Sequence, residues 1–142
     1  MTDGKLLLET LLKDARLAQI YIRNLLHIPM DPGLREILKG QYREFDTIET
    51  DARLLAIQRG WEPREADAAL LLFCGRLIRV SLRTKDADSR IAGRMILRYT
   101  RAMIRERRNS HAYTGRDPSL GILCRKLLDC ETAAIRSLQR YL

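Results

Sequence analysis

The sequence is poor in the residues that metal sites, disulfide frameworks and many catalytic sites need. Its 142 residues include two histidines, and neither lies three residues after a glutamate, as the Glu-x-x-His pairs of di-iron bundles require. The three cysteines, Cys74, Cys124 and Cys130, form no Cys-x-x-Cys pair, so neither zinc nor a disulfide framework is expected. We therefore expect reduced, buried thiols in a cytoplasmic protein that has no metal and no other cofactor.

Proline, glycine and aromatic residues are also scarce. The chain has 4 Pro and 8 Gly, and aromatic residues make up 6% of it, which argues against a disordered or β-rich protein. No stretch has the roughly 18 consecutive apolar residues of a membrane span. The beginning of the chain, MTDGKLLLETLL, has no signal-peptide pattern. We expect one globular domain over residues 1–142 and no membrane association.

What the sequence has in abundance is leucine and arginine in helical patterns. We expect helices over 5–27, 32–59 and 64–84, then an arginine-rich helix that includes 90–108, and a last helix over 118–141. Two Asp-Pro pairs, at Asp31 and Asp117, predict helix starts, because aspartate caps a helix and proline suits its first turn. Gly60 predicts the end of the second helix. We expect Thr2 or Asp3 to cap the first helix and 109–116 to form a polar loop.

The arginine-rich stretch has the clearest periodicity in the chain. At about 100° per residue its arginines gather within roughly 80° of one another. Leu97 and Ile104 form an apolar edge beside them. The opposite side is apolar and predicted to be buried: Ile91, Ala92, Met95, Ile96, Tyr99, Ala102 and Met103. The candidate interaction face consists of Arg90, Arg94, Arg98, Arg101, Arg105 and Arg108.

These elements predict an all-α bundle of five helical segments. If the segment 64–84 runs the length of the bundle as a crossover, the helices before and after it become parallel, which is the connectivity of a ferritin-like four-helix bundle. The alternative is a closed five-helix bundle, which uses the same helices and buries 64–84 more deeply.

One carboxylate stands out in the last helix. Glu131 lies beside the apolar stripe of Leu127, Ala134 and Leu138, and we expect it to be a buried carboxylate that pairs with an arginine such as Arg90, Arg94 or Arg98. A weaker hypothesis makes Glu131 and Glu49 the remnant of a carboxylate metal site.

Two segments, QRGWEPREADAALL and DADSRIAGRMILRYTRAMI, resemble the ferritin-like proteins of spore-forming Firmicutes related to spore coat protein F. The shared features are Gly60, Trp61 and Pro63 at a helix end, a Ser-x-Ile-Ala helix start at Ser89, and a C-terminal helix from Glu131 to Leu142. The resemblance implies a ferritin-like fold. Arg90, Gly93 and Leu97 occupy positions where relatives carry polar or metal-binding side chains, so it implies a member without a metal centre.

The arginine face has three interpretations. The first is a solvated basic surface, since charged helix faces usually meet water. The second is a subunit interface, because arginine is enriched there. The third is an anion or nucleic-acid surface, which the net charge of +8 suggests but the scarcity of aromatics does not favour.

We therefore predict that the protein is not an enzyme and acts by self-association, most simply as a homodimer, or by binding a protein partner. The alternative is a polyanion-binding module that uses the basic helix 90–108.

Overall fold

The computed structural model describes residues 4–62, 86–113 and 115–142, and every regular element among them is a helix. α1 spans Gly4–Leu25, α2 Pro32–Arg59, α4 Ala87–Ala112 and α5 Pro118–Gln139. The predicted helix over 64–84 and the predicted first cap, at Thr2 or Asp3, lie outside the described residues. No helix in the described part is long and apolar enough to cross a membrane.

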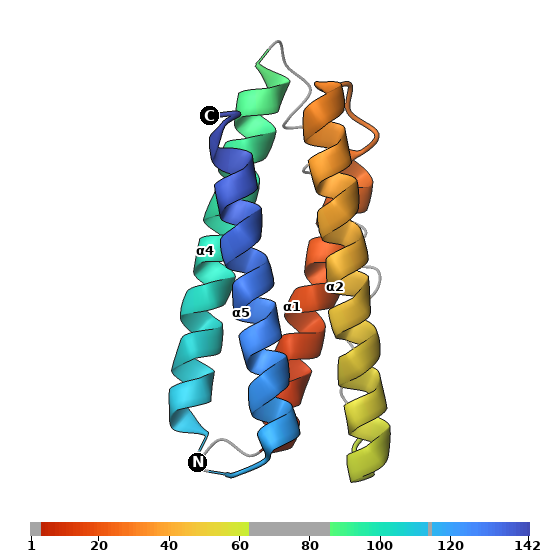
Figure 1. The fold of residues 1–142 in the computed structure, drawn as a ribbon, viewed down its shortest axis with the longest axis vertical. Helices are drawn as coiled ribbons and strands as arrows, with labels where there is room; N and C mark the ends of the chain where they lie inside the picture. Colours follow the sequence, from red (N-terminus) through yellow and green to blue (C-terminus); the bar gives the residue numbers. More distant parts are fainter. Residues whose placement is uncertain (1–3, 63–85, 114) are drawn as a thin grey trace.

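The four helices form an elongated bundle (Figure 1). α1 packs mainly on α2, α4 packs mainly on α5, and α2 and α5 close the bundle between them. α2 and α4 run in one direction while α1 and α5 run in the other. The backbone N–H of Asp31, just before α2, donates to the Asp88 carboxylate in the first turn of α4, at 3.0 Å. The expected parallel pair of helices is therefore present.

The end of α2 and the start of α4, which flank the undescribed stretch, lie at opposite ends of the bundle. A crossover connection and a fifth bundle helix both agree with this placement. The part of the chain that distinguishes these two arrangements is outside the described residues.

The predicted caps fix the ends of α2. The Asp31 carboxylate accepts hydrogen bonds from the N–H groups of Gly33 and Leu34, and Pro32 is the first helical residue. At the other end Gly60 adopts a left-handed conformation with φ of 69°, and the N–H groups of Gly60 and Trp61 bond to carbonyls of the last turn. These start and stop signals are confirmed, and so are the helix limits that they predicted.

The core contains the predicted apolar stripes. On α2, Leu38, Phe45, Ile48, Ala52 and Leu55 are buried, and Gln41 is buried among them. On α4, Ile91, Ala92, Met95, Tyr99 and Ala102 are buried, while Ile96 and Met103 are partly buried. The stripes of the first and last helices are buried at Leu8, Leu11, Ala15, Ala18, Ile22 and Leu25 and at Leu120, Leu127, Cys130, Ala134 and Leu138.

Three predicted helix ends are wrong, and one of them is the end of α5, which lies at Gln139 rather than at Tyr141. α4 continues through Asn109 to Ala112, where a polar loop was expected, because the stretch before Gly115 has no proline or glycine to end it. α1 ends at Leu25 rather than at His27, and hydrogen-bonded turns carry the chain to Ile28.

Candidate functional site

The arginine face of α4 is largely turned toward solvent. Five of its six arginines are exposed, and Arg98 is partly buried. Leu97 and Ile104, beside them, are 47% and 54% exposed. This face therefore presents guanidinium groups and aliphatic side chains together, a composition typical of binding surfaces.

Two of these arginines are held by α1. The guanidinium of Arg98 lies over the ring of Tyr21, 4.0 Å from its centroid, in a cation–π contact. Arg105 donates to the buried carboxylate of Asp14 at 3.0 Å. Burial lowers the pKa of Arg98, and the nearby Tyr21 and Asp14 partly offset that effect. The arginine face is thus both a surface and a lateral contact between α1 and α4.

A hollow of about 210 Å³ opens between these two helices. Its walls are Tyr21 of α1 and five side chains of α4: Arg94, Leu97, Arg98, Arg101 and Arg105. The hollow therefore concentrates positive charge at one place on the bundle.

Inside the bundle, three helices each contribute a buried carboxyl group. Asp14 of α1 is 5% exposed, and Glu106 of α4 and Glu131 of α5 are each 2% exposed. If all three groups are ionised, some of their oxygens lack a hydrogen-bond partner: both oxygens of Glu106, one of Asp14 and one of Glu131. Uncharged acids avoid this deficit because a protonated carboxyl group donates a hydrogen bond.

The pKa values agree with such proton sharing. Burial, hydrogen bonding to Glu131 and Asp14, and their charges raise the pKa of Glu106 far above its ordinary value. Burial also raises the pKa of Glu131 to about 7, although the bond from Glu106 and the charges of Arg105 and Arg98 act in the opposite direction. At neutral pH Glu106 is therefore the neutral donor and Glu131 the acceptor that titrates.

Glu131 is buried, as predicted, but the prediction that it forms an ion pair with an arginine is wrong. Its hydrogen-bonding neighbour is Glu106, and in the described part of the chain no ion pair joins it to Arg90, Arg94 or Arg98. The bundle core places it among other acids, and Arg98 and Arg105 reach it only through their electrostatic fields.

More polar pairs lie in or beside the core. The Tyr99 hydroxyl donates to Gln41 at 2.7 Å, and both residues are buried. The Cys130 thiol donates to Glu44 at 3.2 Å, and burial followed by this bond raises its pKa. A thiol held in the protonated state is a poor nucleophile. Cys124 is also free and buried, and Cys74 lies outside the described residues.

The weaker metal hypothesis does not fit the arrangement of the carboxylates. Glu49 bonds to Gln19 and to Arg53, whereas Glu131 bonds to Glu106. Across the described ranges, no group of three or more His, Cys, Asp and Glu side chains is arranged to hold a metal ion. His27, just after α1, and His111, in the last turn of α4, are both exposed.

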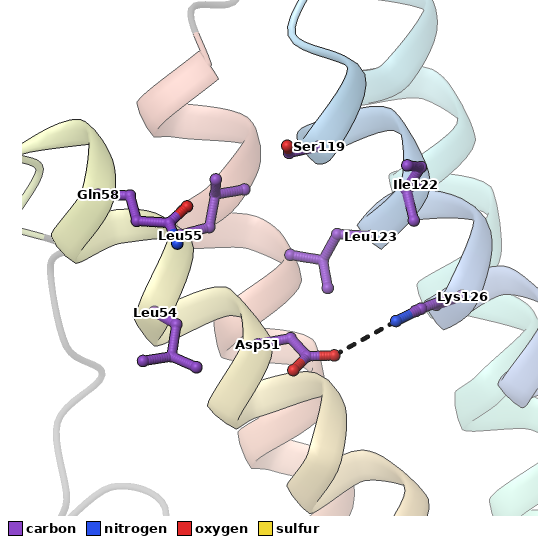
Figure 2. Close-up of a pocket in the computed structure, with 8 residues that line it drawn as sticks. All are labelled: Asp51, Leu54, Leu55, Gln58, Ser119, Ile122, Leu123 and Lys126. Atoms are coloured by element: carbon purple, nitrogen blue, oxygen red, sulfur yellow. Dashed lines mark hydrogen bonds and ion pairs between the residues drawn. The ribbon is translucent and has the colours of Figure 1, made fainter.

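On the opposite side of the bundle, a groove of about 310 Å³ lies between α2 and α5 (Figure 2). Leu55 and Leu123 are its buried floor, and the rims carry Leu54, 53% exposed, and Ile122, 59% exposed. Asp51 and Lys126 face each other across the groove at 3.5 Å. Ile57, one turn from Leu54, is 74% exposed.

The sequence contained a signal for the buried acids that was missed. Asp14 lies three residues after Leu11 and four before Ala18, and Glu106 lies four after Ala102, so both continue the apolar stripe of their helix.

Comparison of the chain with protein-family models, with curated proteins and with solved structures finds no match.

Proposed function

We propose that the protein is a non-catalytic bundle that acts by self-association, and that the α2–α5 groove is the surface through which two copies meet. The observation that carries this proposal is the presence of exposed aliphatic side chains on both rims of the groove, Leu54 and Ile122, beside a buried leucine floor. Contiguous exposed apolar surface of this kind marks interaction sites.

Charge favours a second copy as the occupant. The chain carries a net charge of +8, so most pairs of its surfaces repel each other. The groove instead carries one acid and one base, Asp51 and Lys126. In a two-fold interface each surface meets itself, so Asp51 of one copy can pair with Lys126 of the other.

The experiment is sedimentation velocity over a range of protein concentrations. We expect a reversible dimer that Ile122→Glu dissociates, because a carboxylate in an apolar interface is left without a partner. The matched control is Ile104→Glu, since Ile104 has nearly the same exposure, 54%, but lies on α4. A strict monomer at high concentration, or equal dissociation by both variants, contradicts the proposal.

A charge exchange tests the proposed pairing more closely. Asp51→Lys is expected to weaken the dimer, because it places two lysines opposite each other. The double variant Asp51→Lys/Lys126→Asp restores opposite charges and is expected to recover much of the association. No recovery would mean that these residues do not meet across the interface.

We also propose that the fold is ferritin-like and that the bundle has no metal centre. Two observations support this: α2 and α4 are parallel, as a four-helix bundle with one long crossover requires, and the core acids hydrogen-bond to one another. Elemental analysis of the purified protein tests the second part, and stoichiometric iron or manganese would contradict it.

Polyanion binding through α4 is the second candidate function. The exposure of five arginines along one helix supports it. Its signature is binding to DNA or RNA that weakens steeply as salt rises, because each phosphate contact releases counterions. Fluorescence anisotropy with a labelled oligonucleotide at low and physiological salt measures this, and an absence of binding at low salt contradicts it.

A further inference from the structure

The three buried acids, Asp14, Glu106 and Glu131, meet at one level of the bundle, and we call them the acid layer. Glu106 interacts with both of the others. It is 2% exposed, and when it is ionised neither of its oxygens has a hydrogen-bond partner among the described residues. A buried carboxyl group is accommodated far better when it carries a proton and can donate to a neighbouring carboxylate. The contact of α1 with α4 and α5 at this level therefore depends on protonation.

The next layer of the core consists of small side chains. Each acid has a buried alanine one turn away on its own helix: Ala18 on α1, Ala102 on α4 and Ala134 on α5. Because α4 runs opposite to α1 and α5, all three alanines lie on the same side of the acid layer. An alanine buries much less apolar area than a leucine or isoleucine, so separating the helices at this level exposes little apolar surface.

Partly exposed polar contacts join α1 to α4 on both sides of the acid layer. Asn109 donates to Thr10 at 3.3 Å on one side, and the cation–π contact of Arg98 with Tyr21 lies on the other. Between them the half-exposed Arg105 pairs with the acid of α1 at 3.0 Å. Contacts of this kind are replaced by water at little cost. The hollow between α1 and α4 lies beside them.

The charged and titratable groups around Glu106 and Glu131 come from all four described helices. They are Asp14 of α1, Glu44 of α2, Arg98, Tyr99 and Arg105 of α4, and Cys130 of α5. Burial is the largest influence, and it raises the pKa of Glu131 to about 7 against the fields of the two arginines. A raised folded pKa means that the stabilisation is complete at mildly acidic pH and is lost as pH rises through about 7.

We propose that the acid layer is a pH-dependent contact that holds α1 against α4 and α5 at acidic pH and opens locally above neutral pH, while α2 stays folded. Ionised Glu131 has to be hydrated. Separation of α1 from α4 at this level brings water to it, and the alanines and the partly exposed polar contacts oppose that separation only weakly. The α2–α5 groove takes no part, so the inference is independent of the proposed self-association.

The test is amide hydrogen exchange followed by mass spectrometry at pH 6 and pH 8.5, with each rate divided by the intrinsic rate at that pH. At pH 8.5 we expect the amides around Asp14 and Glu106 to be roughly tenfold or more less protected than those in the middle of α2. Their exchange should hardly change with urea below the unfolding transition, because a local opening exposes little surface. Equal protection with equal urea dependence in all three helices would show global unfolding and overturn the proposal.

Glu131→Gln tests the assigned group. The amide keeps an acceptor for Glu106 but does not titrate, so between pH 6 and pH 8.5 it should remove the loss of protection around the acid layer. In the unmodified protein this loss can reach about tenfold for each pH unit above 7. The matched control is Glu36→Gln on the exposed surface of α2, which should behave like the unmodified protein. An unchanged loss in Glu131→Gln overturns the proposal, and the urea test does so without any variant.

Discussion

Glu106 on α4 and Glu131 on α5 lie next to each other inside the bundle, close enough for a neutral Glu106 to donate a hydrogen bond to Glu131. Both folded pKa values lie above the unfolded value of about 4.3. Between the unfolded and folded pKa values the folded protein binds more protons than the unfolded chain, so stability falls as pH rises. The contribution of Glu131 to the free energy of unfolding is lost as the pH rises through about 7. The contribution of Glu106 continues to fall above that pH.

Glu106→Gln should flatten this decline. The amide still donates to Glu131 but does not titrate, so the free energy of unfolding should fall less between about pH 5 and pH 8 and should be higher at the upper limit. Each titrating group contributes at most about 1.4 kcal/mol per pH unit to the slope. Denaturant unfolding at several pH values measures it.

The control for this prediction is Glu36→Gln on exposed α2 surface, where the side chain is 68% exposed. It should leave the pH slope unchanged. An unaltered slope in Glu106→Gln itself would show that Glu106 is not protonated in the folded protein.

The Tyr99–Gln41 pair should be strongly coupled. Tyr99→Phe leaves the buried Gln41 side-chain oxygen without its donor and is expected to cost about 1–3 kcal/mol. Gln41→Leu similarly leaves the tyrosine hydroxyl without its acceptor. The double variant removes both polar groups and should cost less than the sum of the single changes. Urea unfolding of the unmodified protein, the two single variants and the double variant gives the four free energies of this double-mutant cycle. Strict additivity of the changes would contradict the predicted coupling.

Two glycines in and beside α2 should respond to alanine in opposite ways. A Cβ added at either Gly60 or Gly40 meets nothing within 4 Å, so packing is not the difference. Gly60 has φ of +69°, and Gly60→Ala should cost about 1 kcal/mol because this region disfavours a Cβ. Gly40 is helical, and Gly40→Ala should gain about 0.5–1 kcal/mol. Thermal unfolding compares their signs, and a shift in the same direction would contradict the prediction.

Asp117 has two roles, and its variants separate them. It caps α5 through the N–H of Ser119 and forms a two-pronged ion pair with Arg59 at 2.8 and 2.9 Å. Asp117→Ala removes both and should cost about 1–2 kcal/mol, chiefly through the cap. Arg59→Ala removes the exposed ion pair alone and should cost less than Asp117→Ala, because solvent screens an exposed ion pair. Denaturant unfolding ranks them, and the reverse order would contradict a dominant cap.

The helix order and most helix limits could be predicted because short-range chemistry sets them. Asp31 followed by Pro32, and Gly60 at the far end, act on neighbouring backbone groups, so the α2 boundaries follow from local sequence. The end of α4 has no such signal, and polarity alone wrongly predicted a loop from Asn109.

The candidate sites could be predicted only in part. The arginine face follows from spacing within one helix, so all six residues were identified. The hollow requires Tyr21 of α1, and the acid cluster requires Asp14 beside Glu106 and Glu131. Such contacts between helices depend on how the packed helices are rotated and shifted along their axes. The sequence pattern of one helix does not contain this information.

The capped end of α2 also supplies a spectroscopic probe. Trp61, the single tryptophan of the chain, packs where α1 and α5 begin: a Cβ added at Gly4 would lie 2.9 Å from its ring and 3.4 Å from Leu120. Its fluorescence therefore reports on fraying of this one end of the bundle. Circular dichroism, in contrast, averages over every helix. Thermal unfolding followed by Trp61 fluorescence can therefore be compared with thermal unfolding followed by circular dichroism, and a lower midpoint in the fluorescence curve would show that the bundle opens from the Trp61 end first.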